Sequence, residues 1–129
     1  MTVGLVIVTH EKTGTTLLDE AEFILGEKLD AVECVSFATN AKPEDGLVAI
    51  HAAVERAEQG AGVLILADLI GSSPSNRAAD LLQHCGAVMV TGINLPMLIS
   101  VWNYRDKPLG MLARKAVESG RRGIKIIQE

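Results

Sequence analysis

The sequence predicts an α/β fold with a doubly wound, mainly parallel sheet of about five strands and helices on both faces. Two observations lead to this prediction. The apolar runs at residues 3–8 and 62–67 are short and rich in branched side chains, which is typical of strands buried on both faces of a parallel sheet. Amphipathic helical segments alternate with such runs, and no repeat or linker interrupts them, so we expect a single domain over residues 1–129.

Each element follows from its apolar spacing and from the residues that end it. The first strand covers about residues 2–9, and the helix after it starts at Thr15 or Thr16 and ends at Leu25, before Gly26. Gly120 is expected to end the last helix. The other predicted elements are strands at 31–37, 62–67, 87–90 and 123–127, and helices at 43–58, 74–85, 96–104 and 109–119.

The composition argues against several classes of protein. The net charge is −4, and the scarcity of aromatic residues counts against base-stacking surfaces for single-stranded nucleic acid. Met1 leads directly into the first strand, and no apolar run reaches the ~18 residues of a membrane span. We therefore expect a cytoplasmic protein that does not insert into the membrane. Cys34 and Cys85 lack the spacing of metal ligands, so we interpret both as reduced core residues and expect no metal site.

Two polar side chains follow the strands that should lie side by side. His10 comes at the end of the first strand, and Asp68 follows the strand at 62–67. The commonest strand orders of such sheets make these two strands neighbours at the switch point, so His10 and Asp68 should lie within reach of each other. A carboxylate that accepts a hydrogen bond from one imidazole nitrogen fixes the tautomer and leaves the other nitrogen as a nucleophile.

A phosphate site is predicted directly after Asp68. Pro74 suits the first turn of a helix with Ser73 as its N-cap, so free backbone N–H groups and the helix dipole favour an anion there. The residues that would bind the phosphoryl oxygens are Gly71, Ser72 and Ser73. A nucleophilic histidine beside this site predicts phosphoryl transfer onto His10. The alternative is that His10 is structural or a metal ligand and that Asp68 only caps a helix.

Three segments resemble the IIA component of the mannose class of the bacterial phosphoenolpyruvate-dependent phosphotransferase system. They are the strand that ends at Thr9-His10, residues 68–76, and residues 92–98, and the resemblance covers the chain in order. It implies that His10 accepts a phosphoryl group from the phosphocarrier protein HPr and passes it to a histidine of a IIB component, for sugar uptake or regulation. It also implies that Asp68 orients His10 and that no metal or organic cofactor takes part.

The resemblance further implies a quaternary structure. Members of this family are often homodimers that exchange a C-terminal strand, which here would be residues 123–127, the last and antiparallel strand. One position departs from the family, because Ser72 stands where a second glycine usually precedes Ser-Pro or Thr-Pro. No IIB domain or linker follows, so we expect a free-standing IIA component.

Other functions fit parts of the same pattern. The phosphotransfer subunit of dihydroxyacetone kinase is the nearest alternative, but residues 73–76 and 94–97 match the mannose class better. A flavodoxin would hold a flavin phosphate with residues 13–16, although aromatic residues are scarce near the strand ends. A receiver domain would be phosphorylated on Asp68, but it needs acidic residues at the end of the first strand to bind magnesium. A protein that only binds a partner, without phosphoryl transfer, is the remaining alternative. We interpret His51 and His84 as surface or interhelix residues.

Overall fold

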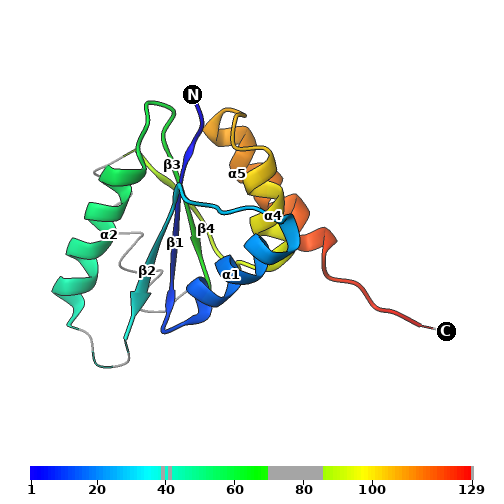
Figure 1. Ribbon diagram of the computed structural model, residues 1–129, viewed down its shortest axis with the longest axis horizontal. Helices are drawn as coiled ribbons and strands as arrows, with labels where there is room; N and C mark the ends of the chain where they lie inside the picture. Colours follow the sequence, from blue (N-terminus) through cyan, green and yellow to red (C-terminus); the bar gives the residue numbers. More distant parts are fainter. Residues whose placement is uncertain (39, 41, 70–85, 129) are drawn as a thin grey trace.

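The protein is built around a parallel sheet that lies between two layers of helices (Figure 1). The structure is a computed structural model, and it describes residues 1–38, 40, 42–69 and 86–128. Within these residues the sheet has four strands in the order β2-β1-β3-β4, all parallel. They are β1 (Gly4–His10), β2 (Val32–Phe37), β3 (Val63–Ala67) and β4 (Val88–Val90).

Helices cover both faces of the sheet. The alternation along β1 separates two cores, because Leu5 and Ile7 pack on one face while Val6 and Val8 pack on the other. Helix α2 (Pro43–Ala57) covers the face of Val6 and Val8, and Figure 1 shows it alone on that side of the sheet among the labelled helices. The opposite face is covered by α1 (Thr13–Leu25), α4 (Leu95–Asn103) and α5 (Leu109–Arg122). The predicted doubly wound fold is confirmed.

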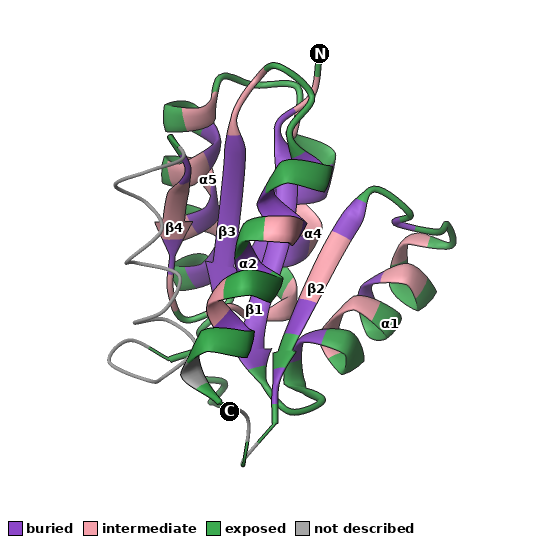
Figure 2. Cartoon of the chain, turned by 90° about the vertical axis from the view of Figure 1, so that its left-hand side faces the viewer, coloured by how far each residue is buried: buried purple, intermediate pink, exposed green. Residues whose placement is uncertain are grey.

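The two central strands, β1 and β3, are buried and lie side by side. In β1 all residues from Gly4 to Thr9 are buried, and in β3 all five residues are buried, as the colours of Figure 2 show. β1 pairs with β2 on one side and β3 on the other, which confirms that the first and third strands are neighbours. His10 is the last residue of β1 rather than a residue beyond it, because its pairing with Phe37 extends the ladder by one residue.

The end of the last helix differs from the prediction. Gly120 lies inside α5, which continues to Arg122. Gly120 is buried against α4, and a Cβ atom at this position would lie 2.8 Å from Cε of Met97. The glycine therefore allows α4 and α5 to pack closely instead of ending the helix.

The predicted fifth strand is wrong for the single chain. Residues 123–128 form no strand and lead away from the body of the protein (Figure 1). Ile124, Ile126 and Ile127 are 75, 84 and 87% exposed. A strand needs a neighbour for its backbone hydrogen bonds, and within the described chain this segment has no neighbouring strand. The predicted helix at 74–85 lies outside the described residues. None of the helices that the structure describes is both long enough and apolar enough to cross a membrane.

The contact between β1 and the end of α2 yields a stability prediction. A Cβ atom on Gly4 would lie 2.1 Å from the backbone oxygen of Ala57, so the two elements could not keep their distance. We expect Gly4→Ala to lower the free energy of unfolding by about 3 kcal/mol. Gly110→Ala is the control, because nothing lies within 4 Å of its Cβ position and alanine favours the helix. Urea denaturation measures both, and a Gly4→Ala protein as stable as the wild type would contradict this packing.

Candidate functional site

His10 and Asp68 meet at the carboxyl edge of the sheet, where β1 and β3 end. Oδ2 of Asp68 lies 2.9 Å from Nδ1 of His10 and also accepts a hydrogen bond of 3.0 Å from the backbone N–H of His10. The other carboxylate oxygen, Oδ1, accepts a hydrogen bond of 2.8 Å from the backbone N–H of Leu69. The side chain of His10 is 47% exposed and that of Asp68 only 15%. The structure thus brings together the two side chains that the strand order predicted.

The charge of Asp68 decides which nitrogen of His10 carries a proton. Partial burial alone would raise the pKa of Asp68, but the hydrogen bonds from the backbone and ring of His10 and from Leu69 outweigh it and lower this pKa below its ordinary value. Asp68 is therefore ionised at neutral pH and can only accept hydrogen bonds. In neutral His10 the hydrogen is placed on Nδ1, and Nε2 keeps a free lone pair.

The segment after β4 fixes the position of Asp68. The backbone N–H of Gly92 donates a hydrogen bond to the carbonyl oxygen of Asp68, and the N–H of Ile93 donates one to the carbonyl oxygen of Ala67. Both donor–acceptor distances are 3.0 Å. Gly92 has a φ of 80°, which suits glycine. Asn94 then caps α4, with its Oδ1 accepting from the N–H of Met97 at 2.9 Å. The residues that begin the motif at 92–98 therefore hold the backbone of Asp68 in place, a role that the sequence alone did not indicate.

The turn between β1 and α1 fixes His10. Thr9 is fully buried, and its Oγ1 accepts a hydrogen bond of 2.7 Å from the backbone N–H of Gly14. Glu11 has a positive φ of 40°, and its N–H donates to the carbonyl oxygen of Phe37 at 2.8 Å. The first turn of α1 contains no acidic residue, and no side chain caps it. The unusual backbone of Glu11 had no sequence signal, because glutamate is not a residue type that favours it.

The remaining predicted site residues are not all placed. Gly71, Ser72 and Ser73, the predicted phosphate-binding residues, lie outside the described residues, as do His84 and Cys85. Among the described residues, no group of three or more His, Cys, Asp or Glu side chains is arranged to hold a metal ion.

Two other predicted residues lie apart from this site. His51 is exposed on α2, with its Nδ1 3.5 Å from Glu55 Oε1. Cys34 is a free thiol in the middle of β2, and desolvation, together with the nearby carboxylates of Glu33, Asp19 and Glu22, raises its pKa to about 11. Cys34 is therefore a protonated thiol at neutral pH, as expected for a structural cysteine.

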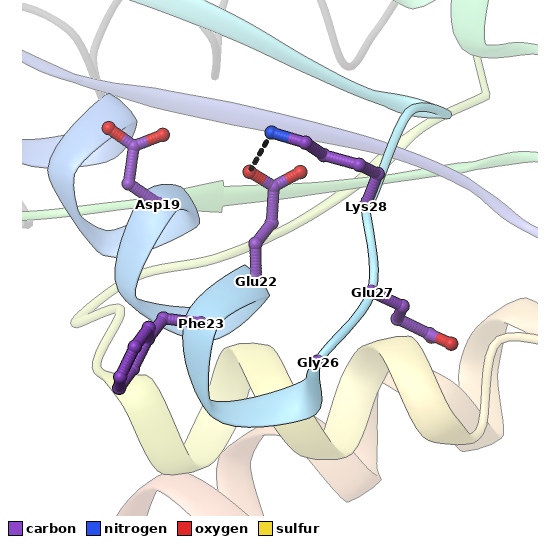
Figure 3. A pocket seen from close by; sticks show the side chains of 6 residues that line it. All are labelled: Asp19, Glu22, Phe23, Gly26, Glu27 and Lys28. Atoms are coloured by element: carbon purple, nitrogen blue, oxygen red, sulfur yellow. Dashed lines mark ion pairs between the residues drawn. The ribbon is translucent and has the colours of Figure 1, made fainter.

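A hollow of about 460 Å³ lies at the far end of α1 (Figure 3). It is lined by Asp19, Glu22, Phe23, Gly26, Glu27 and Lys28. Helix α1 begins three residues after His10, and these residues belong to its second half and to the turn beyond it. The charged groups here are partly engaged, since Lys28 Nζ lies 3.9 Å from Glu22 Oε1. The hollow is thus separate from the His10 and Asp68 pair.

Fold and site together define a doubly wound α/β protein with an exposed, carboxylate-bound histidine where β1 and β3 end. A family model, EIIA-man, described as "PTS system fructose IIA component", matches residues 4–117. The chain therefore belongs to the mannose-type family of phosphotransferase system IIA components. This family membership favours the phosphoryl-carrier interpretation over the flavodoxin, receiver and dihydroxyacetone kinase alternatives.

Individual relatives agree with the family. The chain is 32% identical over 133 residues to the PTS system mannose-specific EIIAB component of Escherichia coli (strain K12). This match covers 99% of the chain but only 40% of the length of that relative. EIIA from Streptococcus agalactiae is similar in structure, with a TM-score of 0.86, 25% identity and 96% of each chain covered. The mannose/sorbose specific IIA subunit from Enterococcus faecalis has a TM-score of 0.90 at 22% identity, covers 100% of this chain and 97% of its own, and supports the fold.

Proposed function

We propose that the protein is a phosphoryl carrier that accepts a phosphoryl group from phospho-HPr on Nε2 of His10 and passes it to a histidine of a IIB component. The observation that carries the proposal is the 2.9 Å contact between His10 Nδ1 and Asp68 Oδ2. It leaves Nε2 with the lone pair on a ring that is 47% exposed. Family membership supports the same role.

The proposed transfer is a direct displacement between two imidazole rings. The Nε2 lone pair of His10 forms a bond to phosphorus while the bond between phosphorus and the donor nitrogen breaks, and the donor ring keeps that electron pair. The ring of His10 becomes cationic, and the carboxylate of Asp68 stabilises that charge through the Nδ1 hydrogen. In the transfer to IIB, His10 is the donor: the acceptor histidine forms the bond to phosphorus, and Nε2 of His10 keeps the electron pair of the bond that breaks. No proton has to leave Nδ1 in either step.

Positive potential is available for the transferred group. Helix α1 starts close to His10 without a capping side chain, so its N-terminal dipole favours an anion nearby. In this proposal Gly71, Ser72 and Ser73 bind the phosphoryl oxygens. Phosphoryl transfer depends mainly on positioning and electrostatic stabilisation. The chain's own groups therefore suffice without a metal or organic cofactor.

The test is phosphorylation of the purified chain with phosphoenolpyruvate, enzyme I and HPr, followed by mass spectrometry. We expect one phosphoryl group on His10, lost in acid and transferred when a IIB component is added. Omitting HPr is the control and should give no label. Label on His51 or His84, or no label with active HPr, would contradict the proposal.

We also propose that the protein is a homodimer in which each chain adds residues 123–127 to the partner's sheet as an antiparallel strand. The exposed isoleucines of this segment support the proposal. A groove of about 570 Å³ lies between the edge strand β4 and α5, with Val88, Val90, Ala113 and Val117 in its lining. An apolar strand beside β4 would fill this groove and complete the edge of the sheet.

Removing the tail should therefore change the oligomeric state. We expect a chain that ends at Arg122 to be a monomer in light scattering, whereas the full chain is a dimer. Ile124 and Ile126 lie two residues apart, so they would face the same side of the added strand. Ile126→Asp should weaken the dimer and Lys125→Ala should leave it intact. A dimer that persists after truncation would show that the tail is not the exchanged element.

In this proposal, residues 1–129 form one IIA domain that acts in the cytoplasm. The free thiol of Cys34 fits a reducing compartment. The carrier site would bind protein partners and the phosphoryl group. The IIB partner would then carry the phosphoryl group onward, for sugar uptake or for regulation.

A further inference from the structure

A polar groove of about 420 Å³ lies between α4 and α5, and neither His10 nor Asp68 contributes to its lining. The two helices lie side by side (Figure 1), and the hydroxyl group of Ser119 on α5 donates a hydrogen bond of 2.7 Å to that of Ser100 on α4. The polar side chains that α4, its C-terminal neighbour and α5 contribute to the lining are Ser100, Asn103, Tyr104, Lys115, Ser119 and Arg122. None of the described residues in this lining is acidic, so the groove favours a polar, anionic ligand.

Two cationic side chains lie at opposite ends of this groove. Lys115 and Arg122 stand on one face of α5, two helical turns or about 10 Å apart along its axis, and Ser119 lies between them. Nζ of Lys115 lies 4.6 Å from the centre of the Tyr104 ring, which holds this ammonium group at the groove. Arg122 forms an exposed ion pair with Glu118 on its own helix. Such a pair contributes little, so a phosphate group can compete for the guanidinium.

We propose that this groove binds a sugar bisphosphate. One phosphate group lies at Lys115 and the other at Arg122, since ammonium and guanidinium groups both form charge-assisted hydrogen bonds with phosphate oxygens. The hydroxyl groups of Ser100 and Ser119 and the amide group of Asn103 also line the groove and pair with the hydroxyl groups of the sugar. A hexose with a phosphate at each end has a length comparable to the separation of the two cations, whereas a monophosphate reaches only one of them.

Titration of the full ¹⁵N-labelled chain with fructose 1,6-bisphosphate, followed by NMR, tests the proposal. The amide signals of Ser100 and Ser119 should shift, and those of Thr9 and His10 should not. The Kd should be about tenfold lower than that for fructose 6-phosphate, because the monophosphate lacks one charge-assisted contact. Inorganic phosphate should bind no more tightly than the monophosphate.

Single substitutions locate the two phosphate groups. Lys115→Gln and Arg122→Gln should each raise the Kd for the bisphosphate about tenfold, to the value for the monophosphate. Lys107→Gln is the matched control, because this exposed lysine lies before α5 and does not line the groove. It should bind the bisphosphate as the wild type does. The melting temperature checks that each variant is folded.

Several results would overturn the proposal. Shifts confined to Thr9 and His10 would place the ligand at the carrier site, and the absence of any shift at millimolar bisphosphate would exclude the groove as a site. Equal Kd values for the bisphosphate and the monophosphate would refute a site with two phosphate positions. An equal loss of affinity in Lys107→Gln would mean that only the overall charge matters. The titration uses neither HPr nor phosphoenolpyruvate, so its result is independent of the proposed phosphoryl transfer.

Discussion

Replacement of His10 by alanine is expected to abolish phosphoryl acceptance from HPr, with a loss of rate of more than about 10³-fold. Nε2 of His10 is the proposed nucleophile, and Asp68 then has no imidazole to orient. The fold should survive, because Oδ2 of Asp68 still accepts the backbone N–H of residue 10. Labelling from phosphoenolpyruvate measures the loss, and the melting temperature checks folding.

His51→Ala is the matched control for this experiment. It removes an exposed imidazole that also lies near a carboxylate, Glu55, but on α2. The variant should be labelled as fast as the wild type. Retained label in His10→Ala together with loss in His51→Ala would place the phosphoryl group elsewhere and refute the assignment.

Asp68→Asn is expected to slow transfer about 10²- to 10⁴-fold while leaving the histidine in place. The asparagine amide group can donate a hydrogen bond to Nδ1 of His10, which moves the ring hydrogen to Nε2, where the lone pair is needed. The carboxylate that stabilises the cationic ring is also lost. Single-turnover labelling measures the rate, and ¹⁵N NMR of the imidazole should show more hydrogen on Nε2 than in the wild type.

The pH dependence separates this effect from general loss of charge. Because its hydrogen bonds lower the pKa of Asp68, the wild-type contribution of this carboxylate should be present throughout the neutral range and vanish only in strong acid, as pH falls through that pKa. The defect of Asp68→Asn should thus be constant around neutral pH. Asp19→Asn, an exposed carboxylate on α1, is the control, and an equal defect there would contradict a specific role for Asp68.

The sequence was sufficient for the features that depend on burial and topology. The apolar runs of β1 and β3 are buried on both faces, and the order of elements makes them neighbours, so the approach of His10 to Asp68 followed without side-chain detail. The ends of elements were less predictable. Gly120 looked like a helix stop, yet its missing side chain serves the contact with Met97.

Features set by backbone hydrogen bonds between distant segments had no local signal. The hydrogen bond from the N–H of Gly92 to the carbonyl oxygen of Asp68 depends on the pairing of β3 with β4, which brings the two residues together. The left-handed turn at Glu11 likewise depends on Phe37 at the end of β2. The tail at 123–127 has the apolar pattern of a strand, but a strand also requires a neighbour, which the described chain does not provide.

Oδ2 of Asp68 accepts two hydrogen bonds from the same residue, His10. The bonds come from the ring and from the backbone of His10, and together they favour a single orientation of the imidazole. In the proposed relay, a phosphoryl group on Nε2 would therefore point in one direction, and the donor and acceptor proteins would approach along the same path. Transfer through this carrier should follow ping-pong kinetics, and an excess of unphosphorylated acceptor should inhibit competitively against the donor.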